Sequence, residues 1–327
     1  MNNRRKLIVA LGASALVSHL SSFAQPQAKV WRVGYLGLSS ASGFVPQIEA
    51  LRTGLRDYGY IEGKNLVIEF RWADGKYERL PELAAELVNL KVDVLVTTGT
   101  PGTIAAKSAT VTTPIVMTTS GDAVGAGLVA SLARPGGNVT GSTFFVPELM
   151  AKRIEFIKEA MPRAQRIAVL QNADDISNVP VRKAMDATAK SLKIELQKFE
   201  IRSLVEFENI FTAMVKGRVD AVVVQEEVLF SSNTKSVAEH AARHRIFSAG
   251  APQFATVGCV IGYGANTLDL FRRVGYFADK IFKGAKPAEI PVERPTKFEL
   301  IVNMKTAKTL GIKIPNSILV RADKVIE

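Results

Sequence analysis

Short apolar runs alternate with longer amphipathic segments along most of the chain. The run Val92–Thr97 is apolar except at Asp93, which is typical of a strand buried on both faces. The segment Tyr77–Leu90 instead repeats Leu80, Leu83 and Leu87 at helical spacing, so one face of a helix would be apolar. This alternation predicts parallel sheets that are covered on both faces by helices.

The alternation predicts two successive series of strands and helices. In the first series we expect strands at 30–36, 65–70, 92–97, 114–117 and 139–145, and helices at 46–58, 77–90, 104–109 and 123–132. In the second we expect strands at 166–170, 194–199, 220–224, 246–247 and 260–263, and helices at 148–160, 181–192, 205–215, 234–244 and 268–282. The predicted fold is α/β, with two doubly wound, Rossmann-like lobes and a ligand cleft between them.

The boundary between the lobes is expected near Val146–Pro147, where the pattern restarts. Lobe 1 would span 25–146 and be completed by about 266–300, because that stretch is left over after the second series. Lobe 2 would span 147–265. The last stretch, 301–327, could complete lobe 2, but the pattern does not decide which lobe this segment joins.

The N-terminus has the layout of a secretory signal peptide. The basic group Arg4–Lys6 precedes the uncharged apolar run Leu7–Val17, and Ser22–Ala24 places small residues before Gln25. The apolar run is shorter than the roughly 20 residues of a membrane span. The alternative to a signal peptide is a buried N-terminal helix. The sequence therefore predicts a cleaved leader over 1–24 and a periplasmic mature protein, by the general or the twin-arginine route.

Composition argues against several other classes of protein. The net charge is +11, but Lys and Arg are spread beside acidic residues without a basic block, so no nucleic-acid partner is expected. The single cysteine, Cys259, cannot form an internal disulfide. His240 and His244 share a helix face but lack a cysteine partner or the glutamate of a zinc-protease motif, so no metal and no cofactor are expected.

Catalytic signatures are absent from the sequence. We find no nucleophile elbow, no phosphate-binding loop and no histidine directly after a strand. The adjacent carboxylates Glu226 and Glu227 could serve as an acid and a base, but neighbours at a strand end point to opposite sides. The protein is therefore predicted not to be an enzyme.

Residues that follow the predicted strands are the candidates for a binding site, because ligands of parallel sheets bind beyond the carboxyl ends of the strands. In Thr98–Pro101, Thr100 suits a helix N-cap and Pro101 the first helical position, while Gly99 allows close approach. Such a turn could bind a carboxylate, or it could only begin a helix. Asp122 could likewise accept a ligand ammonium or cap the helix after it.

The complete set of candidates shares this position after a strand or offers a ring for stacking: Ser39, Ser40, Thr98, Gly99, Thr100, Thr119, Asp122, Asn172, Gln225, Glu226, Gly250 and Tyr263. For each of these, an ordinary turn or core position is the alternative. Other aromatic residues that could stack on a ligand are Phe44, Tyr77, Phe230 and Phe254.

Several blocks of sequence resemble one protein family. They are Gly59–Asn65, Asp122–Val129, Arg134–Gly141, Lys283–Glu293, Val302–Gly311 and Arg321–Ile326. Together they are similar to the exported substrate-binding proteins of ABC transporters, in a group in which tryptophan or tyrosine is the ligand of some members. The chain departs from the usual pattern at Ala123, where many relatives have proline, and in the loop Ala251–Ala255.

The resemblance implies a type I periplasmic binding protein fold, with a small solute held between two closing lobes. It also implies an ABC permease and its ATPase as partners, and a monomer. In members that bind an aromatic amino acid the first lobe takes the carboxylate and the ammonium, where Thr98, Gly99, Thr100 and Asp122 stand in this chain.

We therefore predict an extracytoplasmic solute-binding protein of an ABC importer, with an amino acid or an aromatic compound as the favoured solute. The alternatives are a sensory receptor that signals to a membrane kinase and an enzyme that uses the same cleft. A transcription regulator of the same fold is disfavoured by the leader and by the lack of a helix-turn-helix segment before Val30.

Overall fold

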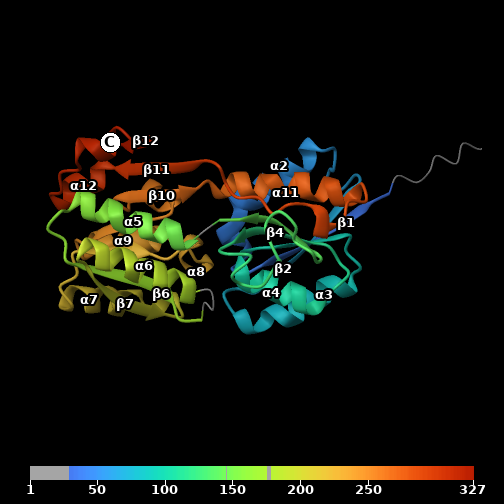
Figure 1. Ribbon diagram of the computed structural model, residues 1–327, viewed down its shortest axis with the longest axis horizontal. Coiled ribbons are helices and arrows are strands. Elements are labelled where there is room, and N and C mark those ends of the chain that lie inside the picture. Colours follow the sequence, from blue (N-terminus) through green and yellow to red (C-terminus); the bar gives the residue numbers. More distant parts are fainter. Residues whose placement is uncertain (1–28, 145, 175–177) are drawn as a thin grey trace, which may run out of the picture. The chain divides into compact units, whose positions relative to one another are not determined.

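Two β-sheets organise the chain from Trp31 to Glu327, which forms one compact unit of the computed structural model (Figure 1). The structure describes residues 29–327 except 145 and 175–177, so the predicted leader lies outside the described residues. Within the described part of the chain, no helix combines the length and the apolar character needed to cross a membrane.

The first sheet has five parallel strands in the order β2-β1-β3-β4-β5. Its strands are β1 (Trp31–Gly37), β2 (Leu66–Trp72), β3 (Val94–Thr97), β4 (Ile115–Ser120) and β5 (Val139–Thr143). The helices in this part of the chain are α2 (Val45–Asp57), α3 (Leu80–Asn89) and α4 (Gly99–Ala109), with 3-10 turns η1 (Ala41–Phe44) and η2 (Tyr77–Arg79).

The second sheet has seven strands in the order β12-β11-β10-β9-β8-β6-β7. They are β6 (Arg166–Asn172), β7 (Glu195–Ile201), β8 (Ala221–Val224), β9 (Phe247–Gly250), β10 (Ile261–Ala265), β11 (Phe298–Asn303) and β12 (Lys324–Ile326). All pairs are parallel except β10 with β11. The helices here are α5 (Val146–Ala160), α6 (Asn178–Leu192), α7 (Phe207–Lys216), α8 (Val228–Ser231), α9 (Thr234–Arg243), α10 (Pro252–Thr256), α12 (Met304–Leu310) and α13 (Asn316–Leu319).

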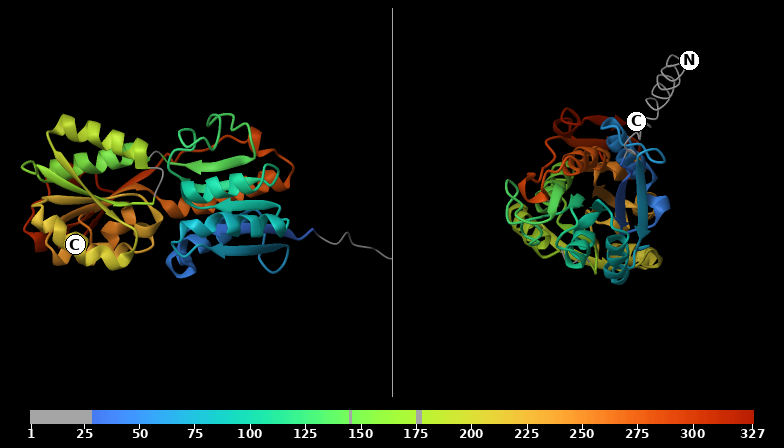
Figure 2. Two further views of the ribbon diagram at one scale, coloured as in Figure 1. Left: turned by 90° about the horizontal axis from the view of Figure 1, so that it is seen from below. Right: turned by 90° about the vertical axis from the view of Figure 1, so that its right-hand side faces the viewer.

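The central strands of both sheets are buried on both faces, as the continuous apolar runs require (Figure 2). In β3, Leu95 joins one hydrophobic cluster while Val94 and Val96 join the cluster on the opposite face. In β6, Val169 and Leu170 likewise belong to different clusters. This two-sided burial explains why these strands show no alternation of apolar and polar residues.

The chain returns to the first sheet after β10. The long helix α11 (Thr267–Phe282) packs alongside α2, and Ile290 and Val292 join the clusters of the first sheet (Figure 1). The hydroxyl of Thr140 donates to the carbonyl of Ile290 at 2.8 Å. The following strand, β11, then pairs with β10 in the second sheet.

Two sequence predictions of local structure are wrong. Residues 123–132 form turns and not a helix, because Gly125 and Gly127 favour other conformations and Gly127 adopts φ of +67°. The short helices α8 and α10 lie in stretches that the pattern left as loops. Each has five residues or fewer, which is too short for a periodic signal.

The close contact between α2 and α11 depends on two glycines. A methyl group at Gly54 would lie 1.9 Å from the carbonyl oxygen of Arg272, and one at Gly275 would lie 2.0 Å from that of Gly54. Since both neighbours are backbone atoms, the helices would have to separate.

We predict that Gly54→Ala lowers the free energy of unfolding by about 1–3 kcal/mol, because overpacking forces the helices apart. Urea denaturation of the variant measures the change. Gly137→Ala is the matched control, because no atom lies within 4 Å of its added methyl group, and it should change stability by less than about 0.5 kcal/mol. Equal stability of the two variants would contradict the close contact.

Candidate functional site

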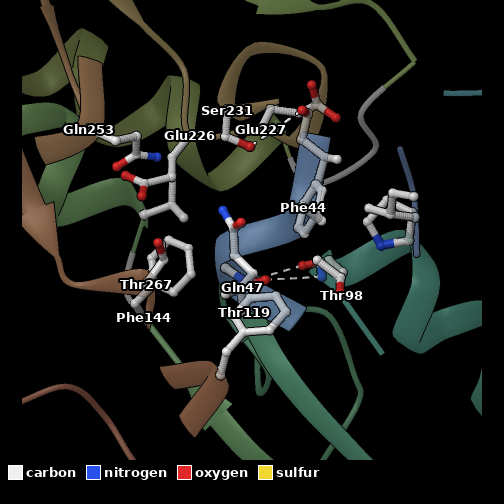
Figure 3. A pocket seen from close by; sticks show the side chains of 18 of the residues that line it. Phe44, Gln47, Thr98, Thr119, Phe144, Glu226, Glu227, Ser231, Gln253 and Thr267 are labelled. Atoms are coloured by element: carbon white, nitrogen blue, oxygen red, sulfur yellow. Dashed lines mark hydrogen bonds between the residues drawn. The ribbon is translucent and has the colours of Figure 1, made fainter. Parts of the chain in front are cut away.

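A pocket lies where the carboxyl ends of β3, β4 and β8 meet the first residues of α4 and α8 (Figure 3). The pocket is lined by residues from the segments around both sheets and by two residues of α11. The lining comprises Leu38, Phe44, Gln47, Tyr77, Thr98, Gly99, Thr100, Pro101, Thr119, Gly121, Phe144, Val146, Glu226, Glu227, Val228, Ser231, Gln253, Thr267 and Phe271.

One wall is the start of α4, where Thr98–Pro101 line the pocket. Gly99 adopts φ of +70°, and its amide donates to the hydroxyl of Thr119 at 3.2 Å. Thr98, and not Thr100, is the N-cap residue, so that prediction is wrong by two positions. The hydroxyl of Thr100 instead accepts from the amide of Gly121 at 3.2 Å and ties α4 to the end of β4.

Aromatic rings and one amide side chain form the middle of the pocket. Phe44, Tyr77, Phe144 and Phe271 contribute rings, and Figure 3 shows Gln47 lying between Phe44 and Phe144. The side-chain oxygen of Gln47 is buried and has no hydrogen-bond partner within the described residues. Because buried polar atoms are normally paired, this oxygen is suited to accept a hydrogen bond from a solute.

The opposite wall carries two carboxylates with different partners. Glu226 forms an ion pair with Arg153, whose side chain is fully buried. Glu227 accepts a hydrogen bond from the hydroxyl of Tyr77, and it caps α8 by accepting from the amide of Leu229 at 2.7 Å. Burial raises the pKa of Glu227 to about 8, against the opposing effect of the backbone hydrogen bonds.

The structure brings five of the twelve candidate residues into the pocket lining: Thr98, Gly99, Thr100, Thr119 and Glu226. The other seven lie outside it: Ser39, Ser40, Asp122, Asn172, Gln225, Gly250 and Tyr263. Asp122 accepts from the amide of Gly125 at 2.9 Å, which stabilises the turn after β4. Ser39 donates to the hydroxyl of Ser232 at 3.0 Å, and Ser40 lies 3.1 Å from that of Ser42.

The remaining four residues outside the lining belong to the second sheet or its loops. Asn172 accepts from the amide of Asp174 at 3.0 Å, and Gln225 is buried. Gly250 ends β9 against the ring of Phe254. The ring of Tyr263 packs on other aromatic rings outside the pocket.

Sequence reasoning missed several lining residues, among them Gln47, Phe144, Ser231, Gln253, Thr267 and Phe271. Gln47 and Phe271 lie inside helices. From sequence alone, Gln47 would be interpreted as a surface residue and Phe271 as a core residue. No signal in one sequence shows that these helix faces meet. Across the described residues, no group of three or more His, Cys, Asp or Glu side chains is placed to hold a metal ion.

This geometry defines a class of protein. Two mostly parallel sheets with a polar and aromatic pocket at their strand ends match the type I periplasmic binding protein fold, which confirms the predicted fold class. The model of one family, ABC transporter substrate binding protein, matches residues 40–326. The chain belongs to this family, whose members capture a solute for an ABC transporter.

Individual relatives are consistent with this assignment. The tyrosine-binding protein of Clostridioides difficile (strain R20291) is 28% identical over 273 residues, which cover 82% of this chain and 78% of that protein. The structure of a conserved domain protein from Vibrio cholerae is 27% identical, with a TM-score of 0.84 over 91% of this chain and 100% of that chain. The structure of an ABC domain in complex with L-Trp from Streptococcus pneumoniae is also 27% identical, with a TM-score of 0.81 over 90% and 100% of the two chains.

The raised pKa of Glu227 predicts a pH dependence of stability. In the native state this carboxyl keeps its proton up to about pH 8, whereas in the unfolded state it loses the proton near its ordinary value of 4.5. The native state therefore binds more protons between these values, and the free energy of unfolding falls as pH rises from 4.5 to 8. Glu227→Gln should remove this part of the dependence in urea denaturation between pH 5 and 8.

Glu148→Gln is the control, because Glu148 is exposed on α5, and its pH profile should follow that of the unmodified protein. If the profile of Glu227→Gln also follows it, Glu227 is not protonated in the native state at neutral pH.

Proposed function

We propose that this protein captures an amino acid, with an aromatic side chain favoured, in the pocket between Thr98–Pro101 and Glu226. The observation that carries the proposal is the pairing of a hydrogen-bond-donating wall with a carboxylate on the facing wall. The N-terminal end of α4, with its positive dipole, and the hydroxyls beside it suit a carboxylate group. Glu226 suits an ammonium group, which would be bound by charge-assisted hydrogen bonds.

The rest of the lining suits an apolar or aromatic side chain of the solute. Rings such as Phe44, Phe144 and Phe271 offer apolar contact and edge or stacked packing. Gln47 adds a hydrogen-bond acceptor, which an indole N–H or a phenol O–H could use. The relatives named for tyrosine and crystallised with L-Trp support this choice of solute class.

The proposal includes the setting in which the protein works. Residues 1–24 would be a cleaved signal peptide, so the mature monomer would act in the periplasm and deliver its solute to an ABC permease and its ATPase. The parts built on the two sheets would be two lobes that close on the solute, with their boundary near residue 146. Closure would follow from contacts that the solute makes with both lobes at once.

A thermal-shift series tests the solute class. We predict that L-tryptophan or L-tyrosine raises the melting temperature of the mature protein, while glucose and spermidine do not. A ligand at 100 times its dissociation constant stabilises the native state by about 2.7 kcal/mol. Stabilisation by a sugar or a polyamine alone would contradict the proposal.

A pair of variants tests the residues of the site. Thr119→Ala should weaken binding of the amino acid about tenfold, because it removes a hydroxyl that orders the start of α4. Asp122→Ala is the matched control, since its carboxylate bonds to Gly125 outside the lining, and should leave affinity unchanged in calorimetry. The reverse result would move the site to Asp122.

A further inference from the structure

A buried guanidinium lies behind the carboxylate wall of the pocket. Arg153 of α5 has a side-chain exposure of 0% and is itself absent from the lining. Its Nε donates to the carbonyl of Tyr263 at 2.8 Å, and its Nη1 lies 3.5 Å from the carbonyl of Val224. Its Nη2 donates to Oε2 of Glu226, which lines the pocket. Arg153 therefore joins the end of β8 and the middle of β10 to the site.

This arrangement fixes the position of Glu226. A buried charge is tolerated when it is paired, and arginine stays protonated at all physiological pH values. Glu226 is thus bound to a partner that keeps its positive charge. Its second oxygen, Oε1, makes no hydrogen bond that the described residues account for, so it is available to a solute.

The ion pair also sets the net charge of the wall. The positive charge of Arg153 offsets the negative charge of Glu226 at short range, although only the carboxylate faces the pocket. Glu227 adds little negative charge at pH 7, since burial raises its pKa to about 8. Despite two adjacent glutamates, the pocket is close to electrically neutral.

We propose that Arg153 is a positioning and selectivity residue: it orients Glu226 toward the ammonium of the solute and cancels its charge, so that zwitterions bind in preference to simple cations. This inference rests on the proposed capture of an amino acid. A zwitterion uses the donors of α4 and the oxygen of Glu226 together. A cation of the same shape gains no net Coulomb attraction from a neutral wall and leaves the donors unpaired.

Three probes that share an indole ring but differ in charge test this selectivity. L-tryptophan is a zwitterion, tryptamine is a cation and 3-indolepropionate is an anion. Calorimetry at pH 7 should show that the unmodified protein binds L-tryptophan at least tenfold more tightly than either of the other two. L-leucine, isoamylamine and 4-methylpentanoate form the equivalent aliphatic set.

The two single variants should shift this ranking in opposite directions. Arg153→Met leaves Glu226 uncompensated, so the affinity for tryptamine relative to L-tryptophan should rise about tenfold. Glu226→Gln leaves the charge of Arg153 uncompensated, so the affinity for 3-indolepropionate relative to L-tryptophan should rise by a similar factor. The double variant should bind more weakly than the unmodified protein, but without either charge preference.

Met150→Leu is the matched control, because Met150 contacts Arg153 from the same helix and does not line the pocket, and it should keep the original ranking. If Arg153→Met does not fold, Glu226→Gln alone still tests the charge balance. An unchanged ranking in the folded variants overturns the role of Arg153 and leaves the proposed function intact. Failure of both probe sets to bind the unmodified protein overturns the proposed function and this inference with it.

Discussion

Parallel strands all end at the same edge of their sheet, and the site depends on this constraint. The turn Thr98–Pro101 follows β3, Thr119 and Gly121 lie at the end of β4, and Glu226 follows β8. Strand direction brings the ends of β3 and β4 to one edge of the first sheet, and the end of β8, in the second sheet, meets that edge at the pocket. The helix α11 completes the arrangement, because it packs on α2 while its first turn contributes Thr267 to the lining.

The side of the pocket that follows β8 collects charged groups that are expensive to bury, and their partners explain what the pocket can do. Glu226 is held by Arg153, while Glu227 is engaged with Tyr77 and the start of α8. The two carboxylates therefore serve separate partners and are poorly arranged for a joint proton transfer. This agrees with membership of a family of substrate-binding proteins, in which a fixed polar pattern recognises a solute without changing it.

The sequence predicts most of the fold because the core strands are short, apolar and buried on both faces, as in β3 and β6. It also identifies Thr98–Pro101 and Glu226, because turn chemistry and position after a strand are visible along the chain. It fails at 123–132, where apolar residues mimic a helix that Gly125 and Gly127 prevent. It cannot find Gln47, Phe271 or Arg153, since each lies inside a helix and gains its role only when distant segments pack together.

The most direct test of the account is a crystal structure of the mature protein with a bound amino acid. The account predicts that the carboxylate of the solute lies at the start of α4 and that its ammonium lies within hydrogen-bond distance of Glu226 Oε1, with Arg153 still bound to Oε2. A solute bound away from this pocket, or one whose ammonium contacts Asp122 in place of Glu226, would contradict it.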